Sequence, residues 1–384
     1  MKAYIFFFLT AIFFTDCERN QRENNRLLNL QDQLDSLILL KNKQGLFDGT
    51  VVIGGKKVER FERAIGTADR SWGITMKQNF VFDIASLNKS FIASLIMVAE
   101  EEGKLNTSDK LVDHLESFDY KGKFSDEITI HQLLTHTSGL PNYDGVSEEL
   151  RKDNFLKLKR SNFSNNEYVD FISQLDSVAS PGKKFHYSNF AYHLLPIILE
   201  NIYQKSFNQL LQEKICTPLE LERTLSVTNN KIIIEDLVGA YEFNADAGEY
   251  QKNDFIDLTL GRRIFSSAED LYLWGQSLNE NTFLSEPSLK KIKTNHLSGI
   301  NNDISYGYGW AIFDGNGEYK FGDLSVDNKY IIHGGNTGGY QSILVNVNEG
   351  ELIISILSNI GDKSNLLELA STIVKIYNLN NHEI

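Results

Sequence analysis

The chain is poor in cysteine, in proline and in positive charge. Its 384 residues include only two cysteines, Cys17 and Cys216, and five prolines. Two cysteines cannot build a Cys-based zinc site, and no disulfide framework is possible if Cys17 is modified. The 38 Lys and Arg residues are outnumbered by 51 Asp and Glu residues, which gives a formal net charge of −13. This charge argues against nucleic acid and against an anionic membrane surface as partners.

The rest of the composition is that of a globular protein. Hydrophobic residues make up 41% of the chain and charged residues 23%, and no repeat period is visible. The length is sufficient for a large core in one or two domains.

The first 17 residues indicate a targeting segment. An apolar stretch at residues 4–14 is too short to span a bilayer. Cys17 and the polar tether of residues 18–29 resemble the end of a bacterial lipoprotein signal, with Cys17 as the lipidated residue, although Asp16 departs from the Gly, Ala or Ser of such signals. The alternatives are an ordinary cleaved signal and a retained membrane anchor. We expect an exported protein that faces the periplasm or the cell surface and contacts the membrane only through this N-terminal lipid.

A serine and a lysine lie where an extended segment becomes a helix. Apolar residues alternate from position 80 to 84, as in a short strand, and then follow helical spacing over residues 91–99. Ser86 and Lys89 lie three residues apart at the start of this helix, so their side chains share one face. The helix start also offers free N–H groups and the positive end of the dipole. This arrangement suits a nucleophile, a proton acceptor and an oxyanion-binding N–H group.

The Ser-x-x-Lys pattern is not unique to this position. It begins at Ser86, at Ser180 and at Ser288. Ser180 precedes a Pro-Gly turn, and Ser288 lies in a Lys-rich polar stretch, so only Ser86 has an apolar run before it and a buried helix after it. In the structural alternative, Ser86 is a helix N-cap and Lys89 is a solvated residue.

Two further stretches carry candidate site residues. Tyr187 and Asn189 form the only Tyr-x-Asn among 16 tyrosines, where a turn leads into the next predicted helix. The tyrosine hydroxyl is suited to share a proton with a nucleophile and the amide to hold a substrate carbonyl, whereas the structural alternative is an aromatic residue beside an N-cap. His333 begins the only His-x-Gly among eight histidines. Its glycines would let a strand edge approach a ligand, or they form a hairpin turn beside a chance histidine.

Metal ligation is not indicated. His131 and His136 are five residues apart, which misses the i, i+4 face of a metal-binding helix, and no Glu stands at the required place. We predict that this segment is a helix running into a hydrogen-bonded turn. We expect no metal and no cofactor.

Hydrophobic periodicity predicts strands at both ends of the chain and helices between them. The predicted helices are residues 27–40, 166–176, 189–204, 206–215, 271–278 and 363–378, with helical patterns dominant from about 107 to 260. The predicted strands are a hairpin of residues 49–53 and 58–64, and the segments 308–313, 330–333, 340–347 and 351–357.

The ordered set of motifs resembles the serine β-lactamase and D-Ala-D-Ala-peptidase (penicillin-binding-protein-like) superfamily, in its class C-like branch with esterases and D-amino-acid peptidases. The likeness extends over residues 30–375. It rests on Ser86 with Lys89, Tyr187 with Asn189 and the His333 stretch, and on four supporting phrases. These phrases are Phe82-Asp-Ile-Ala-Ser86, Leu133-Leu-Thr-His-Thr-Ser-Gly-Leu-Pro141, Ser266-Ser-Ala-Glu-Asp-Leu271 and Tyr308-Gly-Trp310.

The resemblance implies an α/β (α+β) fold of the β-lactamase/transpeptidase-like type, with an antiparallel sheet flanked by helices. The α/β domain would comprise residues 30–106 plus 265–384. Residues 107–264 would form a mostly helical domain, with the active site between the two.

The resemblance also implies a role for each site residue. Ser86 would be the nucleophile that forms an acyl-enzyme, and Lys89 and Tyr187 the proton-transfer pair, with the identity of the base left open. Asn189 would hold a substrate carbonyl. The backbone N–H groups of Ser86 and Asn336 would form the oxyanion hole on the strand that carries His333 and Gly335.

Two departures from the family pattern affect the choice of substrate. The third motif of β-lactamases is Lys-Thr/Ser-Gly, but here it is His333-Gly334-Gly335, which lacks both the permanent cation and the hydroxyl that grip a β-lactam carboxylate. Arg262 and Arg263 stand where related chains often carry glycines. One of them is a candidate to read an anionic substrate group, and solvated surface is the alternative.

The sequence therefore predicts a serine hydrolase of ester or amide bonds that acts on a small-molecule or peptide-like substrate. The alternative is a catalytically silent module that binds peptidoglycan fragments or a partner protein. A third interpretation, a zinc hydrolase, would require metal-dependent activity. The substrate itself and the oligomeric state are not determined.

Overall fold

A computed structural model describes residues 30–143, 163–229, 231–253, 262–315 and 321–381. The predicted signal and tether, residues 1–29 with Cys17, lie outside the described residues. Within the described ranges, none of the helices combines the length and the apolar character needed to cross a bilayer.

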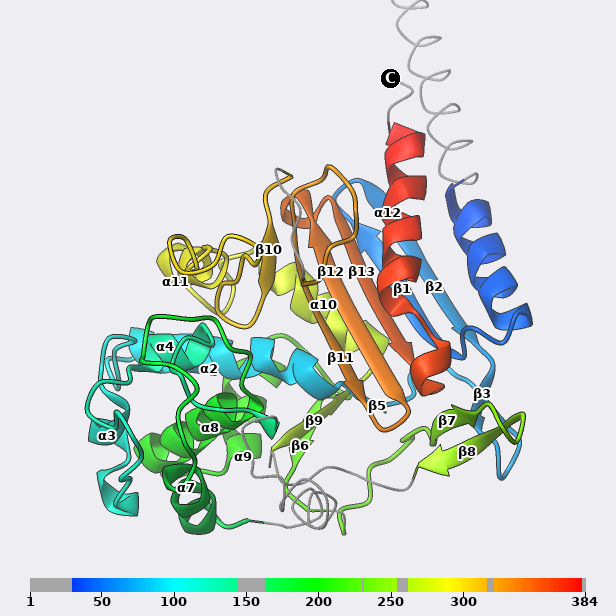
Figure 1. Cartoon of the computed structure of the whole chain (residues 1–384). Coiled ribbons are helices and arrows are strands. Elements are labelled where there is room, and N and C mark those ends of the chain that lie inside the picture. Colours follow the sequence, from blue (N-terminus) through cyan, green and yellow to red (C-terminus); the bar gives the residue numbers. More distant parts are fainter. Residues whose placement is uncertain (1–29, 144–162, 230, 254–261, 316–320, 382–384) are drawn as a thin grey trace, which may run out of the picture.

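A six-stranded antiparallel sheet forms the centre of the molecule, in the order β10-β11-β12-β13-β1-β2 (Figure 1). The strands are β1 (Gly49–Gly55), β2 (Val58–Ile65), β10 (Ala311–Phe313), β11 (Tyr330–Thr337), β12 (Tyr340–Val347) and β13 (Leu352–Ser358). The β1–β2 hairpin from the start of the chain pairs with β13 from its end, with Val51 opposite Ile356. The predicted antiparallel sheet built from both chain ends is therefore confirmed.

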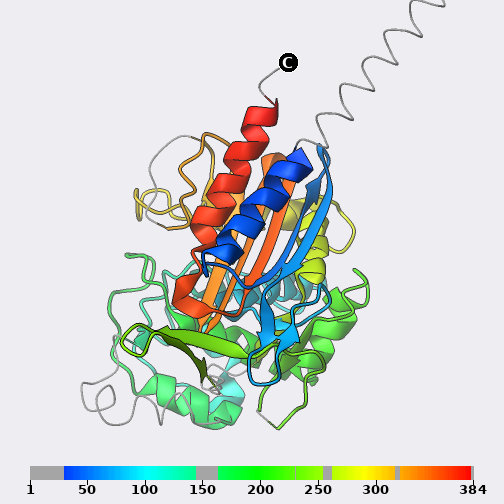
Figure 2. The same cartoon turned by 90° about the vertical axis from the view of Figure 1, so that its right-hand side faces the viewer.

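The alternation of side chains along these strands gives the sheet two apolar faces. On one face Val51, Ile343 and Ile356 pack with the helix of residues 30–43 and with α12 (Leu366–Asn381). On the other face Val52 and Leu344 join the core that contains α2 (Asn88–Glu101) and α10 (Ala268–Ser277). Figures 1 and 2 show the helix of residues 30–43 and α12 side by side on the first of these faces.

The helices from the middle of the chain share this second core. They include α4 (Ile130–Leu134), α7 (Asn165–Ser173), α8 (Asn189–Tyr203) and α9 (Phe207–Leu211), and the shorter α3 (Leu111–His114) lies beside α8. A π-helical turn, Gln212–Cys216, continues α9, and α11 (Glu286–Ile292) packs near α2. One apolar core thus runs without interruption from the sheet into the helices, and the proposed domain division stays a prediction.

The stretch predicted to be helical also contains short strands. β6 (Leu225–Val227) joins β5 (Phe82–Asp83) and β9 (Arg263–Ser266) in a three-stranded sheet, and β7 (Ala240–Asn244) pairs with β8 (Glu249–Asn253). A further two-stranded sheet consists of β3 (Thr67–Asp69) and β4 (Ile74–Thr75). Strands of two to five residues are too short to impose a visible period on the sequence, which is why the helical patterns dominated the prediction.

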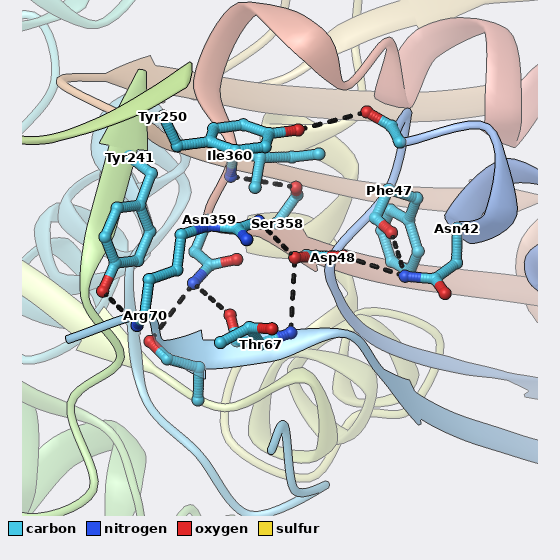
Figure 3. A network of polar contacts seen from close by, with 12 residues as sticks. Asn42, Phe47, Asp48, Thr67, Arg70, Tyr241, Tyr250, Ser358, Asn359 and Ile360 are labelled. Atoms are coloured by element: carbon cyan, nitrogen blue, oxygen red, sulfur yellow. Dashed lines mark hydrogen bonds and ion pairs between the residues drawn. The ribbon is translucent and has the colours of Figure 1, made fainter. Parts of the chain in front are cut away.

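A polar network fastens the β7–β8 hairpin to the end of the large sheet (Figure 3). Arg70 donates to Asp48 at 2.6 Å, and its guanidinium lies over the rings of Tyr241 and Tyr250. Asn359 donates from its side chain to backbone carbonyls of Thr67, Ala68 and Gly239. The network fixes the segment after β13, because Asn359 begins the loop that leads to α12.

Candidate active site

A strained turn presents Ser86 between β5 and α2. Ala85 has a φ of 48°, a left-handed conformation that is costly for a residue with a Cβ. The surrounding contacts hold the turn in this shape: the Ala85 N–H donates to Asp83 Oδ1 at 2.8 Å, and the Ser342 hydroxyl donates to the Ile84 carbonyl at 2.7 Å. Ser86 itself lies in a 3-10 turn, Ala85–Leu87, and Leu87 rather than Ser86 is the N-cap of α2. The interpretation of Ser86 as an N-cap is therefore wrong.

Lys89 is buried beside Ser86. Only 4% of the lysine is exposed, so the interpretation as a solvated residue is also wrong. Its Nζ lies 3.2 Å from Ser86 Oγ and donates to Asn189 Oδ1 at 2.8 Å. Gly309 belongs to the Tyr308-Gly-Trp310 phrase that supported the family resemblance. It packs so closely on the Lys89 backbone that an added Cβ would lie 2.7 Å from the Lys89 carbonyl oxygen.

Burial changes the acid–base character of this lysine. Loss of solvation, together with the positive charge of Arg263, lowers the pKa of Lys89 to about 7. A large fraction of the amine is therefore neutral at neutral pH. A neutral amine 3.2 Å from a serine hydroxyl is able to accept its proton.

Tyr187 completes the contacts around the nucleophile. Its hydroxyl is hydrogen-bonded to the Ser86 side chain, and Lys89 Nζ lies 5.0 Å from the centre of its ring. Burial raises the pKa of Tyr187 above its usual value, so the phenol keeps its proton. The residue precedes α8, and Ser188, whose Oγ accepts from the Ala191 N–H at 3.0 Å, is the N-cap of that helix in place of Asn189.

Asn189 is engaged by protein groups in this structure. Its Oδ1 accepts from Lys89, and its Nδ2 donates to Asn142 Oδ1 at 3.2 Å. The amide thus orients Lys89 through its oxygen while its nitrogen is held by Asn142. Its predicted contact with a substrate carbonyl stays a prediction. Asn142 was not singled out from the sequence, because no local pattern distinguishes it.

The strand β11 brings the His-x-Gly stretch next to Ser86. β10 pairs with Tyr330–Ile332, and among the described residues the part of β11 that follows has no strand partner on that side. A Cβ built on Gly335 would lie 2.8 Å from the Ser86 backbone nitrogen and 2.3 Å from the Ile84 carbonyl oxygen. Glycine is therefore required for β11 to lie this close to the nucleophile, and Asn336 follows at the edge of the pocket.

His333 is a neutral residue. Only 1% of it is exposed, and burial lowers its pKa to about 3. Its Nδ1 lies 2.7 Å from the Gly334 carbonyl oxygen and its Nε2 lies 3.2 Å from the Tyr306 hydroxyl. Since a carbonyl can only accept, Nδ1 carries the proton and Nε2 accepts from Tyr306. His333 does not replace the permanent cation of a lysine.

A cavity of about 600 Å³ opens over these groups. It is lined by Ser86, Tyr187 and the segment His333–Asn336, by the start of β12, and by the residues leading into α12. The volume is in the range of small-molecule sites.

The roles of Arg262 and Arg263 were left open by the sequence, and both side chains form ion pairs within the protein. Arg263 forms a buried ion pair with Asp83, and Arg262 pairs with Glu200. Neither is solvated, so the interpretation as solvated surface is wrong. Neither lines the cavity over Ser86, and the reading of an anionic substrate group stays a prediction. The Asp83–Arg263 pair instead braces the turn before Ser86, because Asp83 also accepts from Ala85. The sequence showed Asp83 within a supporting phrase, but its partner is 180 residues away.

The other sequence candidates lie away from this site. Lys291, the lysine of the Ser288 pattern, pairs with Glu100, and Ser180 is exposed. Among the residues described, no group of three or more His, Cys, Asp or Glu side chains could hold a metal ion. His131 contacts the Tyr308 hydroxyl at 2.7 Å, and His136 lies behind Tyr187.

Comparison with known proteins gives a consistent result along the chain. The family model described as Beta-lactamase matches residues 34–375. The chain is 25% identical over 346 residues to Penicillin-binding protein 4* of Bacillus subtilis (strain 168). The aligned region covers 86% of this chain and 72% of that protein. It is 27% identical over 344 residues to Protein flp of Staphylococcus aureus (strain MW2), with 87% of this chain aligned. The chain spans 64% of the length of that relative.

A solved structure shows the same fold. The D-amino acid amidase from Ochrobactrum anthropi SV3, complexed with L-phenylalanine, matches with a TM-score of 0.73 at 19% sequence identity. The match covers 92% of this chain and 99% of the amidase chain. It confirms the predicted β-lactamase/transpeptidase-like fold.

Proposed function

Since the chain belongs to the Beta-lactamase family, we propose that it is a serine hydrolase that cleaves ester or amide (peptide-like) bonds through an acyl-enzyme on Ser86. The observation that carries this proposal is the buried Lys89, with a pKa of about 7 and its Nζ 3.2 Å from Ser86 Oγ. A purely structural lysine does not need to be desolvated next to a serine on a strained turn.

In the proposed reaction, neutral Lys89 takes the proton of the Ser86 hydroxyl as Oγ attacks the substrate carbonyl. The negative charge that develops on the carbonyl oxygen is held by the backbone N–H groups of Ser86 and Asn336. When the tetrahedral intermediate collapses, the leaving group departs with a proton from the Tyr187 hydroxyl. The Lys89 ammonium then donates its extra proton to the Tyr187 oxygen, which restores the phenol and the neutral amine. Water then attacks the acyl-enzyme, with the same groups acting in reverse, and frees the acid and Ser86.

The pKa shifts support Lys89 as the base. Burial lowers the pKa of Lys89 to about 7 but raises that of Tyr187 above its usual value. Near neutral pH the neutral amine with the protonated phenol is thus the favoured pair. A neutral His333 in the third motif supports an ester or peptide-like substrate in preference to a β-lactam, because it offers no permanent cation to a carboxylate.

A fluorophosphonate probe tests the proposal. We expect one covalent adduct on Ser86, located by mass spectrometry of the digested protein, and none in Ser86→Ala. The labelling rate should fall about tenfold per pH unit below about pH 7, because protonation removes the neutral Lys89 amine. Ser288→Ala, which changes the serine of another Ser-x-x-Lys pattern, serves as the matched control and should label normally.

The outcomes separate the competing hypotheses. Binding of muropeptides without any adduct, and without turnover of esters, amides or a chromogenic cephalosporin, would favour the silent binding module. Activity that chelators remove would favour a zinc hydrolase.

We also propose that the protein is exported and anchored through a lipid on Cys17. The support is the apolar stretch and the polar tether on either side of the cysteine. Cys17→Ser should move the protein from the membrane to the soluble fraction, as judged by fractionation and immunoblotting. An unchanged distribution, or a mature N-terminus at another residue, would contradict the lipoprotein assignment and leave the cleaved signal or the retained anchor.

A further inference from the structure

His136 occupies an unusual position immediately behind the proposed proton donor. It follows α4 in a left-handed conformation, with φ of 56°, and is 0% exposed. Histidine is among the few residue types that adopt this conformation with some frequency. Nothing in the reaction as written uses this side chain.

The backbone on both sides of Tyr187 is hydrogen-bonded to His136. The His186 N–H donates to the His136 carbonyl at 2.8 Å, and the Ser188 N–H donates to His136 Nδ1 at 3.1 Å. One residue thus binds the chain directly before and directly after Tyr187. Because Nδ1 accepts, the ring proton of His136 is on Nε2.

The imidazole ring also packs on Tyr187 itself. Its centre lies 4.3 Å from that of the tyrosine ring, with an interplanar angle of 34°. Tyr192 and Tyr306 approach the same imidazole at 4.7 and 5.2 Å. The ring of His136 is therefore enclosed by aromatic side chains and holds Tyr187 by stacking as well as through the backbone.

The electrostatics exclude a change of charge at this histidine. Burial, and then the nearby charge of Lys89, keep the pKa of His136 well below its usual value. Its Nε2 has no hydrogen-bond partner in the described part of the chain. A neutral ring with one nitrogen occupied by a backbone N–H does not exchange a proton with Ser86.

We propose that His136 is a positioning residue that fixes the Tyr187 hydroxyl against Ser86. The proposal rests on the proposed function, and it assigns a role to the histidine of the Leu133-Leu-Thr-His-Thr-Ser-Gly-Leu-Pro141 phrase. Its effect is expected on kcat rather than on KM. A displacement of about 1 Å of a reacting group can cost 10²-fold in rate, whereas the cavity walls that bind substrate stay in place.

Two substitutions separate the hydrogen bond from the ring. His136→Phe keeps an aromatic ring but loses the Nδ1 acceptor, and we expect kcat to fall about 100-fold with KM within about twofold. His136→Asn places an amide oxygen near the position of Nδ1 and tolerates the positive φ, so kcat should fall by only about tenfold. His131→Asn is the matched control: its ring contacts Tyr308, not Tyr187, and kcat should be unchanged.

The pH profile provides a readout that a purely structural role would not move. In His136→Asn, the smaller amide side chain admits water beside Lys89 and reduces the desolvation of the amine. The acid limb of kcat/KM should therefore move upward from about pH 7 in this variant. An unchanged limb would contradict a role of His136 in enclosing the Lys89–Tyr187 pair.

A double-mutant cycle decides the matter if His136→Phe fails to fold. In the Tyr187→Phe background, with kcat compared on the alkaline plateau where Lys89 is neutral in both proteins, His136→Asn should cost less than about twofold, because there is no hydroxyl left to position. A full tenfold loss in that background, or near-normal kcat for a folded His136→Phe, would overturn the proposal. A parent protein that turns over no substrate and takes no probe would instead overturn the proposed function.

Discussion

Ser86→Ala should abolish turnover, and Lys89→Ala and Tyr187→Phe should each lower kcat by about 10²–10⁴-fold, the range for a positioned acid or base. The Ser86 hydroxyl supplies the nucleophile, so nothing replaces it. Lys89 and Tyr187 both contact Ser86 and act in one proton-transfer path, so their losses should not add. The double variant, Lys89→Ala with Tyr187→Phe, should have a kcat only a little below that of the less active single variant. The measurement is kcat and KM on one good ester or D-amino-acid amide, with folding checked by circular dichroism.

His333→Ala is the contrasting variant in this series. His333 lines the cavity but makes its hydrogen bonds to Gly334 and Tyr306, not to Ser86. We expect it to raise KM or to change the preference among substrates, with a smaller effect on kcat. If Lys89→Ala keeps a near-normal kcat while His333→Ala is inactive, a histidine-based mechanism would replace the one proposed.

Gly335→Ala should lower kcat/KM by about 10³-fold, comparable to the loss of an oxyanion-hole donor. A Cβ at this position would lie 2.8 Å from the Ser86 backbone nitrogen and 2.3 Å from the Ile84 carbonyl oxygen. Both atoms belong to the turn that presents the nucleophile, so β11 and the turn must separate. The two N–H groups proposed for the oxyanion would then no longer converge. The measurement is kcat/KM together with the rate of probe labelling.

The neighbouring glycine provides the control for this prediction. A Cβ on Gly334 would approach the Ser342 carbonyl oxygen at 3.2 Å and otherwise meet only a side-chain atom of Ile343 at 3.9 Å. Gly334→Ala adds the same methyl group one residue earlier and should retain most of the activity. Equal losses in the two variants would show that β11 tolerates no side chain here at all. That result would remove the argument for a specific approach of Gly335 to Ser86.

The elements with strong periodicity could be predicted from the sequence. The alternation in residues 340–347 and the apolar run of 351–357 correspond to β12 and β13, and the Asn189–Tyr203 helix was predicted within one residue. The β-lactamase-type family and fold also followed from three short motifs in a fixed order. These features are encoded locally, because a strand or a helix that buries one face must repeat apolar residues at its own period.

The short strands and the burial of charged residues could not be predicted in this way. The partner of Asp83 is Arg263, far along the chain, and the pattern around either residue does not reveal the pairing. The same holds for Asn142, which binds Asn189, and for His136, which binds the backbone around Tyr187. The two arginines were misjudged because charge alone predicts exposure unless a buried partner is known.

The sequence by itself determined which residue types are present and in what order: a serine and lysine at a helix start, a tyrosine and asparagine before the next helix, and a histidine with glycines on a late strand. Only the tertiary structure decided that Lys89 is desolvated, that Tyr187 contacts Ser86, and that His333 is a neutral residue. The physical reason is that a pKa depends on the water and the charges around a group. In a folded chain those surroundings come from segments about 50 to 260 residues apart in sequence.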